Sequence, residues 1–121
     1  MYQGFKRDIF SKSKVTWTNK IDKKTYNDIN EIVKNHISSG NFLVSQNKGL
    51  SLNSNNFKLK FKLKIFLLKK WNTDNNIFEI NNVLNLMVWL DKNKLPVQKP
   101  QFFKNKKFLI RYKKNYWSFF I

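Results

Sequence analysis

Lysine alternates with large apolar residues in the run FKLKFKLKI, which spans Phe57 to Ile65 and continues as FLLKK to Lys70. A period of two predicts a β-strand, because successive side chains of a strand point to opposite faces. One face would then carry a row of ammonium groups at intervals of roughly 6.7 Å, twice the strand rise. That interval is shorter than the physiological Debye length of about 8 Å, so neighbouring lysines repel one another. Such a row indicates contact with a polyanion.

The whole chain shares this excess of positive charge, with 24 Lys and Arg against 7 Asp and Glu, a net charge of +17 in 121 residues. Codon bias explains part of it, since the chain contains no alanine, 22 lysines and 18 asparagines, as an AT-rich gene would produce. Codon bias does not explain the shortage of acidic residues. Net charge this far from zero opposes compaction unless a partner supplies counter-charge. We therefore interpret the charge as functional.

Basic residues interleave with aromatic ones, as they do on surfaces that bind RNA. Ammonium groups hold phosphates, and flat rings stack on unpaired bases. Only Arg7 and Arg111 are arginines, and lysine point charges favour the phosphate backbone over the reading of bases. The alternative is a solvated face above ordinary core aromatics, and the core is the favoured role for any single ring. The predicted RNA-binding residues are Lys12, Lys14, Lys58, Lys60, Lys62, Lys64, Lys69, Lys70, Lys104, Lys106, Lys107, Arg111, Lys113 and Lys114.

Catalysis finds little support in the sequence. The chain has no cysteine, which excludes disulfides, thiolate zinc sites and cysteine nucleophiles. His36 is the single histidine, near the end of a predicted helix, where a structural role is favoured. Asp28 and Glu31 are spaced to share a helix face and bind a metal, but carboxylates among lysines are more often salt-bridge partners. With no glycine-rich phosphate loop or metal-ligand spacing, we expect no enzyme, cofactor, metal site or small-molecule substrate.

The strongest helix signal lies in residues 21–40. Thr25 followed by Asp28 approximates a capping box, and Gly40 is placed to end the helix in a left-handed cap. A shorter helix over 5–12 is also expected. The apolar residues that share one helix face are Tyr26, Ile29, Val33 and Ile37.

The remaining segments predict mostly strands. We expect a hairpin over 41–52 with its turn at 47–49, and one strand over 57–70 in which Phe66 and Leu68 put apolar side chains on the lysine face. Residues 77–90 fit either helix or strand, with helix favoured for the first part. A second hairpin over 107–121 has Lys113, Lys114 and Asn115 at its tip. The prediction is one α+β domain over 1–121, with one main helix packed on a small antiparallel sheet and 91–107 as an exposed basic extended segment.

Acidic residues interrupt the most apolar part of the chain, and no uncharged apolar run approaches the roughly 18 residues of a membrane span. We therefore expect no membrane insertion. The N-terminal MYQGFKRDIF lacks the apolar core of a signal peptide and is not an Arg- and Ser-rich presequence. Four tryptophans in an AT-biased chain favour a genetic code that reads UGA as tryptophan. These features predict an organelle-encoded protein of the mitochondrial matrix.

A small, very basic, alanine-free chain with this bias resembles the ribosomal proteins encoded in protist-type mitochondrial genomes. The order of FKRDIFSKSKVTW, YNDINEIVKNHISSGNFLV and FKLKFKLKIFLL is similar to the opening half of the bacterial-type small-subunit ribosomal protein eight family, over residues 5–70. The resemblance implies binding to a helical region of small-subunit rRNA. The interval from helix to glycine is longer here, and KKNYWSFFI does not match the family's C-terminal Ser-Thr-Ser segment, so no binding residue is carried over.

The functional hypothesis is a structural rRNA-binding subunit of a mitochondrial ribosome, a ribonucleoprotein of translation. It would dock by lysine–phosphate contacts, with rRNA and neighbouring ribosomal proteins as partners. Two alternatives stay open. One is an accessory subunit of a mitochondrial membrane complex, respiratory or ATP-synthesising, in which the lysines meet acidic subunits or lipid. The other is a small basic nuclease that uses Asp28 and Glu31.

Overall fold

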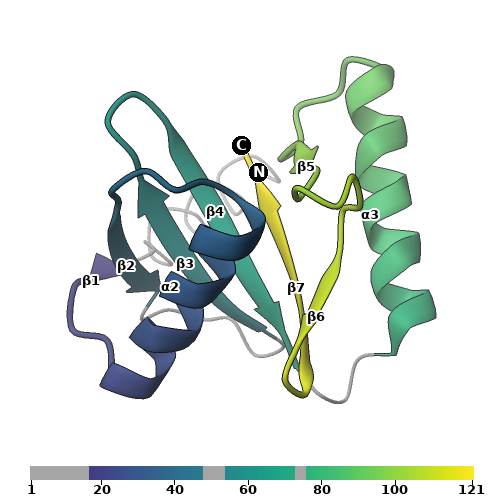
Figure 1. The fold of residues 1–121 in the computed structure, drawn as a ribbon. Coiled ribbons are helices and arrows are strands. Elements are labelled where there is room, and N and C mark those ends of the chain that lie inside the picture. The colour runs from purple at the N-terminus through teal and green to yellow at the C-terminus, as the bar shows by residue number, and fades with distance from the viewer. Residues whose placement is uncertain (1–16, 48–53, 73–75) are drawn as a thin grey trace, which may run out of the picture.

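A computed structural model describes residues 17–47, 54–72 and 76–121. The described residues form an antiparallel sheet with two helices, which confirms the predicted α+β class (Figure 1). The helices are α2 (Lys23–His36) and α3 (Ile77–Lys92). The strands are β1 (Trp17–Thr18), β2 (Leu43–Asn47), β3 (Ser54–Lys60), β4 (Ile65–Trp71), β5 (Pro100–Gln101), β6 (Ile110–Tyr112) and β7 (Asn115–Phe120).

The sheet follows the chain from β1 to β4 and then departs from sequence order. Its strand order within the described residues is β1-β2-β3-β4-β7-β5, and β6 also pairs with β7. All pairings are antiparallel, with Leu68 opposite Phe57 on one side and opposite Phe119 on the other. Strand β4 is therefore central, between a local hairpin partner and a distant one.

Helix α2 covers one face of the sheet. Its apolar stripe has the 3.6-residue period of an amphipathic helix, and Ile29, Ile32 and Val33 are fully buried. Burial of these side chains against strands β3, β4 and β7 forms the main core. The sheet residues of this core are Phe57, Leu59, Leu68, Trp117 and Phe119, joined by Phe103 and Ile110.

Helix α3 packs on the opposite face, because side chains alternate along β4 and β7. Ile80 and Leu84 of the helix are buried against Trp71 and Phe120, and Figure 1 shows α2 and α3 on different sides of β7. The indole N–H of Trp71 donates to Ser118 Oγ at 2.9 Å inside this second core. The sequence predicted one main helix, whereas the described residues contain two of similar length.

The ends of α2 differ from the prediction. Asp22 is the N-cap, and its carboxylate accepts from the backbone N–H of Thr25 at 3.0 Å and from the Thr25 hydroxyl at 2.7 Å. The capping box at Thr25 and Asp28 is wrong because Asp22 lies three residues before Thr25 and caps the helix first. The left-handed glycine cap is also wrong. The helix ends at His36, the N–H groups of Ile37 and Ser38 both bond to the Val33 carbonyl, and no described glycine has positive φ.

The predicted single strand over 57–70 is wrong, because the chain reverses in its middle. Strands β3 and β4 form a hairpin whose turn is closed by the Phe61 N–H bonded to the Lys64 carbonyl at 2.8 Å. Neither glycine nor proline marks this turn, and the lysine alternation continues through it. Reversal places Phe66 opposite Leu59 and Leu68 opposite Phe57. Their side chains therefore face the α2 core, and no partner is needed to cover them.

The other segments follow the prediction more closely. Residues 77–90 are helical throughout, and the C-terminal hairpin places Lys113 and Lys114 between β6 and β7, as predicted. Of the hairpin predicted over 41–52, Leu43–Asn47 is a strand, while residues 48–52 lie outside the described residues, as does the predicted helix over 5–12. Within 91–107, Lys92 ends α3, the lysines are exposed, and Pro100 and Phe103 are buried.

The packing of α3 predicts a contrast between two of its leucines. Leu84 is 1% exposed and Leu86 is 55% exposed. Leu84→Ala leaves a cavity against the sheet and should lower the free energy of unfolding by about 2–5 kcal/mol, whereas Leu86→Ala should change it by less than about 0.5 kcal/mol. Urea titrations at high salt measure both. Equal losses would contradict the placement of α3.

The Asp22 cap predicts a pH dependence. Hydrogen bonds from the Thr25 side chain and backbone lower the pKa of Asp22. A lowered pKa in the folded state adds stability above the ordinary aspartate pKa of about 3.9, and this gain is lost as the pH falls through the lowered value. Asp22→Asn keeps a capping side chain but removes the titration. The thermal midpoint of the wild type should therefore exceed that of the variant near neutral pH, and the gap should close in acid. A gap independent of pH would disprove this account.

Candidate nucleic-acid interface

All of the described predicted RNA-binding residues except Lys104 fall into four groups on the folded chain. Lys12 and Lys14 lie outside the described residues. The lysine row predicted from the alternation is wrong, because the β3–β4 turn removes Lys62 and Lys64 from the face that holds Lys58 and Lys60. The hairpin therefore supplies two pairs of lysines in place of one row of four.

The first group lies on the sheet face opposite α2. Alternation along β3 and β4 puts Lys58, Lys60 and Lys69 on this face. Lys58 Nζ is 5.2 Å from the centre of the Trp17 ring, and Lys69 Nζ is 4.1 Å from that of Trp71. Such cation–π contacts orient an ammonium group over an aromatic face. Burial lowers the pKa of Lys69, so Lys58 and Lys60 are the more accessible charges of this group.

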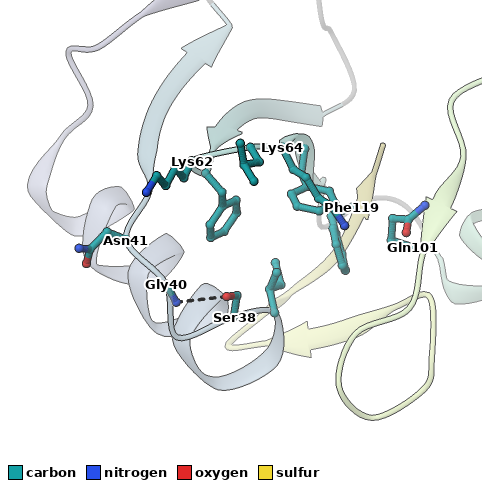
Figure 2. A pocket seen from close by; sticks show the side chains of 11 residues that line it. Ser38, Gly40, Asn41, Lys62, Lys64, Gln101 and Phe119 are labelled. Atoms are coloured by element: carbon teal, nitrogen blue, oxygen red, sulfur yellow. Dashed lines mark hydrogen bonds between the residues drawn. The ribbon is translucent and has the colours of Figure 1, made fainter.

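The second group is the β3–β4 turn, where Lys62, Leu63 and Lys64 are exposed. The turn borders a cavity of about 650 Å³ that is shared with the segment after α2 and with β7 (Figure 2). Both charged residues of the cavity lining are these lysines, and its aromatic residues are Phe61, Phe66 and Phe119. Cationic and aromatic groups thus meet at one place.

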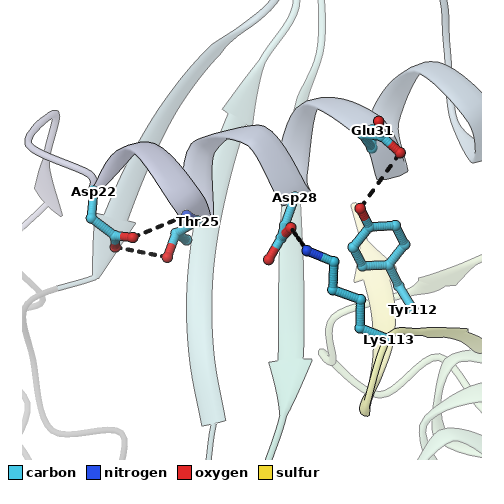
Figure 3. Close-up of polar contacts among 6 residues, drawn as sticks. All are labelled: Asp22, Thr25, Asp28, Glu31, Tyr112 and Lys113. Atoms are coloured by element: carbon cyan, nitrogen blue, oxygen red, sulfur yellow. Dashed lines mark hydrogen bonds and ion pairs between the residues drawn. The ribbon is translucent and has the colours of Figure 1, made fainter.

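The third group surrounds the β6–β7 turn, where Lys113 Nζ forms an ion pair of 2.8 Å with Asp28 Oδ1 of α2 (Figure 3). This hydrogen bond raises the pKa of Lys113, so that lysine already has a counter-ion. Lys24, Lys70 and Lys114 line the same cavity of about 270 Å³. Trp117 lines it too, and its buried indole N–H has no acceptor among the described residues. Asp28 lines the cavity as well but is paired with Lys113, so the other three lysines leave an excess of positive charge that suits an anion.

The two acids considered for metal binding contact the same hairpin. Asp28 is paired with Lys113, and Glu31 Oε2 accepts a long hydrogen bond of 3.5 Å from the Tyr112 hydroxyl (Figure 3). Burial and the Glu31 carboxylate raise the pKa of Tyr112. Within the described ranges no group of three or more acidic or histidine side chains is placed to hold a metal ion. Both acids thus link α2 to the β6–β7 hairpin.

The fourth group follows β5, beside the N-terminal half of α3. Phe102 is 60% exposed and stacks on Phe108, with ring centres 4.2 Å apart and planes 12° from parallel. Lys106, Lys107 and Arg111 line the adjoining cavity of about 420 Å³, and the Arg111 guanidinium lies 5.7 Å from the Tyr116 ring centre. Lys104 is separate from them, because its backbone N–H donates to the His36 carbonyl on the α2 side.

Sequence reasoning missed several residues of these groups. Lys24 joins the third group only because the β6–β7 turn folds against α2. Trp17 contacts Lys58, which is distant in the sequence, and Trp71 contacts Lys69, which is two residues away on the same strand. The outer face of α3 was missed as well: Phe78, Leu86 and Trp89 are 78%, 55% and 57% exposed. Helical spacing of these three residues was the signal that could have revealed this apolar face.

None of the helices in the described part of the chain is long and apolar enough to cross a membrane. No protein-family model matches the chain, and neither a curated protein nor a solved structure matches it.

The charge distribution predicts how the isolated chain behaves. With a net charge of +17 and no polyanion present, self-repulsion should oppose compaction. At low salt the free chain should unfold without a sharp transition, and added salt or short RNA should restore a cooperative melt. Circular dichroism against temperature measures this. A sharp melt of the free chain at low salt would show that no external counter-charge is needed.

Proposed function

We propose that this chain is a structural rRNA-binding subunit of a mitochondrial ribosome. One observation carries the proposal: lysines gather beside aromatic rings in several places on the surface, and among the described predicted residues only Lys113 is paired with an acid. Lysine contacts neutralise phosphates, and the rings beside them suit unpaired nucleotides. The resemblance to mitochondrially encoded ribosomal proteins gives this RNA its proposed identity.

The placement of the lysines favours an RNA that surrounds the protein over a single duplex beside it. Lys69 and Lys70 are adjacent in β4, and alternation sends them to opposite faces of the sheet. Lys69 lies over Trp71 on the α3 side, and Lys70 lies 5.7 Å from the Trp117 ring on the α2 side. A protein embedded in folded rRNA meets phosphates on several sides, which fits this distribution.

The outer face of α3 suits a protein neighbour within such a particle. Its helix carries only Glu79, Asp91 and Lys92 as charged residues. The exposed Phe78, Leu86 and Trp89 lie on its outer face, which they share with the uncharged side chains of Asn82 and Asn85. Exposed apolar surface of this kind marks interaction sites. Neighbouring ribosomal proteins are the proposed partners of this face.

The same apolar face favours a second candidate function, an accessory subunit of a respiratory or ATP-synthesising membrane complex. In that setting α3 would pack on another subunit and the lysines would face acidic protein or lipid headgroups. Sedimentation of the native protein from organelle lysate in a high-salt gradient, with and without RNase, distinguishes the two. Co-migration with a ribosomal subunit that RNase abolishes supports the proposal. Migration with a detergent-solubilised membrane complex, unaffected by RNase, would overturn it.

The two hairpin lysine pairs predict separate effects on the salt dependence of RNA binding. Lys58→Gln with Lys60→Gln, and Lys62→Gln with Lys64→Gln, should each reduce the slope of log affinity against log salt, by about 0.7–0.9 for every phosphate that is no longer neutralised. The control is Lys34→Gln with Lys92→Gln, which removes the same charge from exposed helix ends. Binding titrations at several salt concentrations measure the slopes. If all three variants had the same slope of log affinity against log salt, the β3–β4 hairpin would not be part of the RNA interface.

A further inference from the structure

The cavity beside the β3–β4 turn has the size of a ligand site. Its volume is about 650 Å³, and ligand pockets commonly measure about 300–1,000 Å³. Figure 2 shows that it opens between the segment after α2, which carries Ser38, Gly40 and Asn41, and the turn that carries Lys62 and Lys64. Phe119 of β7 lies on its far side, next to Gln101. Segments distant in the sequence thus line one pocket that is open to solvent.

Three aromatic rings line this cavity, together with the aliphatic side chains of Ile37 and Leu63. The ring centres of Phe61 and Phe66 are 5.7 Å apart with planes at 79°, and those of Phe66 and Phe119 are 5.5 Å apart at 70°. In both contacts the edge of one ring points at the face of the next, which is a favourable geometry for aromatic pairs. Phe42 supports Phe61 from outside the lining, at 5.7 Å. Each of the three lining rings therefore packs against another ring of the same cluster.

The charges at the cavity have one sign. Lys62 and Lys64 are its charged lining residues, and no acidic residue lines it. Ser38, Asn41 and Gln101 add polar side chains. An apolar aromatic interior with a cationic border matches a molecule that joins a flat ring to a phosphate. Among the components of RNA, an unpaired nucleotide has this form.

We propose that this cavity receives one unpaired base of the bound RNA. The base packs against Phe61, Phe66 and Phe119, while Lys62 and Lys64 contact the phosphates on either side of it. This inference rests on the proposed RNA-binding function and adds a recognition element to it, because lysine–phosphate contacts alone do not distinguish a paired from an unpaired nucleotide. A bulged base would then fix the position of the protein on a helical RNA.

Gly40 offers a way to fill the cavity without removing any lining group. A Cβ built on Gly40 lies 3.4 Å from Ser38 Oγ and 3.9 Å from Phe61 Cδ1, which is ordinary contact, and the residue does not have positive φ. Gly40→Leu should therefore fold and place its side chain in the cavity. Ser39→Leu is the matched control, because Ser39 is exposed and does not line the cavity. Circular dichroism verifies that both variants fold.

The test uses the full chain and two RNA hairpins, one with a single bulged 2-aminopurine and one fully paired. The wild type and Ser39→Leu should prefer the bulged hairpin by roughly tenfold, the scale of one base stacked on an aromatic ring, with a change in 2-aminopurine fluorescence. Gly40→Leu should bind both hairpins equally. If the wild type bound the two hairpins with equal affinity, the proposed base site would be wrong, while the proposed RNA-binding function would stand.

Two further results have distinct meanings. If Gly40→Leu retains the preference for the bulged hairpin, the cavity does not hold the base and suits another occupant, such as an aromatic side chain of a neighbouring protein. If the wild type shows no salt-dependent affinity for either hairpin, the proposed RNA-binding function fails as well. As an independent variant, Phe61→Leu keeps apolar volume but removes a ring, and it should lose most of the preference.

Discussion

The reversal of the chain between Phe61 and Lys64 determines how the rest of the sheet is arranged. It sets β4 against β3 so that Leu59 lies opposite Phe66 and Phe57 opposite Leu68. These pairs give α2 a continuous apolar surface to cover. The same register turns Leu67 and Trp71 to the other face, where Trp71 is buried with α3 and Phe120 and Leu67 packs partly buried against them. One turn therefore assigns the apolar residues of β4 to two separate cores.

Burial on both faces of β4 explains where its charges lie. Strand β4 carries its lysines, Lys69 and Lys70, just before Trp71, the last residue of the strand. Both are half-buried, and their ammonium groups lie near indole rings, Lys69 Nζ at 4.1 Å from the Trp71 ring centre and Lys70 Nζ at 5.7 Å from that of Trp117. The core thus determines the places from which cations project.

The sequence indicated much of the fold, because its signals were local. The period of α2 and the Lys113–Lys114 tip of the last hairpin depend on neighbours in the chain, and the structure confirms both. The β3–β4 turn was missed because its own residues continue the lysine alternation and include neither glycine nor proline. Glycine at position 40 suggested a cap, but the helix ends earlier through bonds to the Val33 carbonyl. The composition identified the lysines as candidate binding residues. Their grouping on the surface depends on pairing between strands that are distant in the sequence, and local sequence patterns carry no information about such pairing.

The position of β7 in the sheet affects how the chain folds. Strands β3 and β4 are adjacent in the sequence and pair as a hairpin. The pairing of Leu67 with Phe120 instead joins β4 to a strand that lies beyond α3 and β5 in the sequence. Closing so long a loop costs entropy before the paired strands stabilise each other, so this pairing forms late. Until then β4 presents an unpaired, largely apolar edge of the kind that templates aggregation. Mutual repulsion between chains of charge +17 keeps such intermediates apart, so the lysines also protect the unfinished sheet during folding.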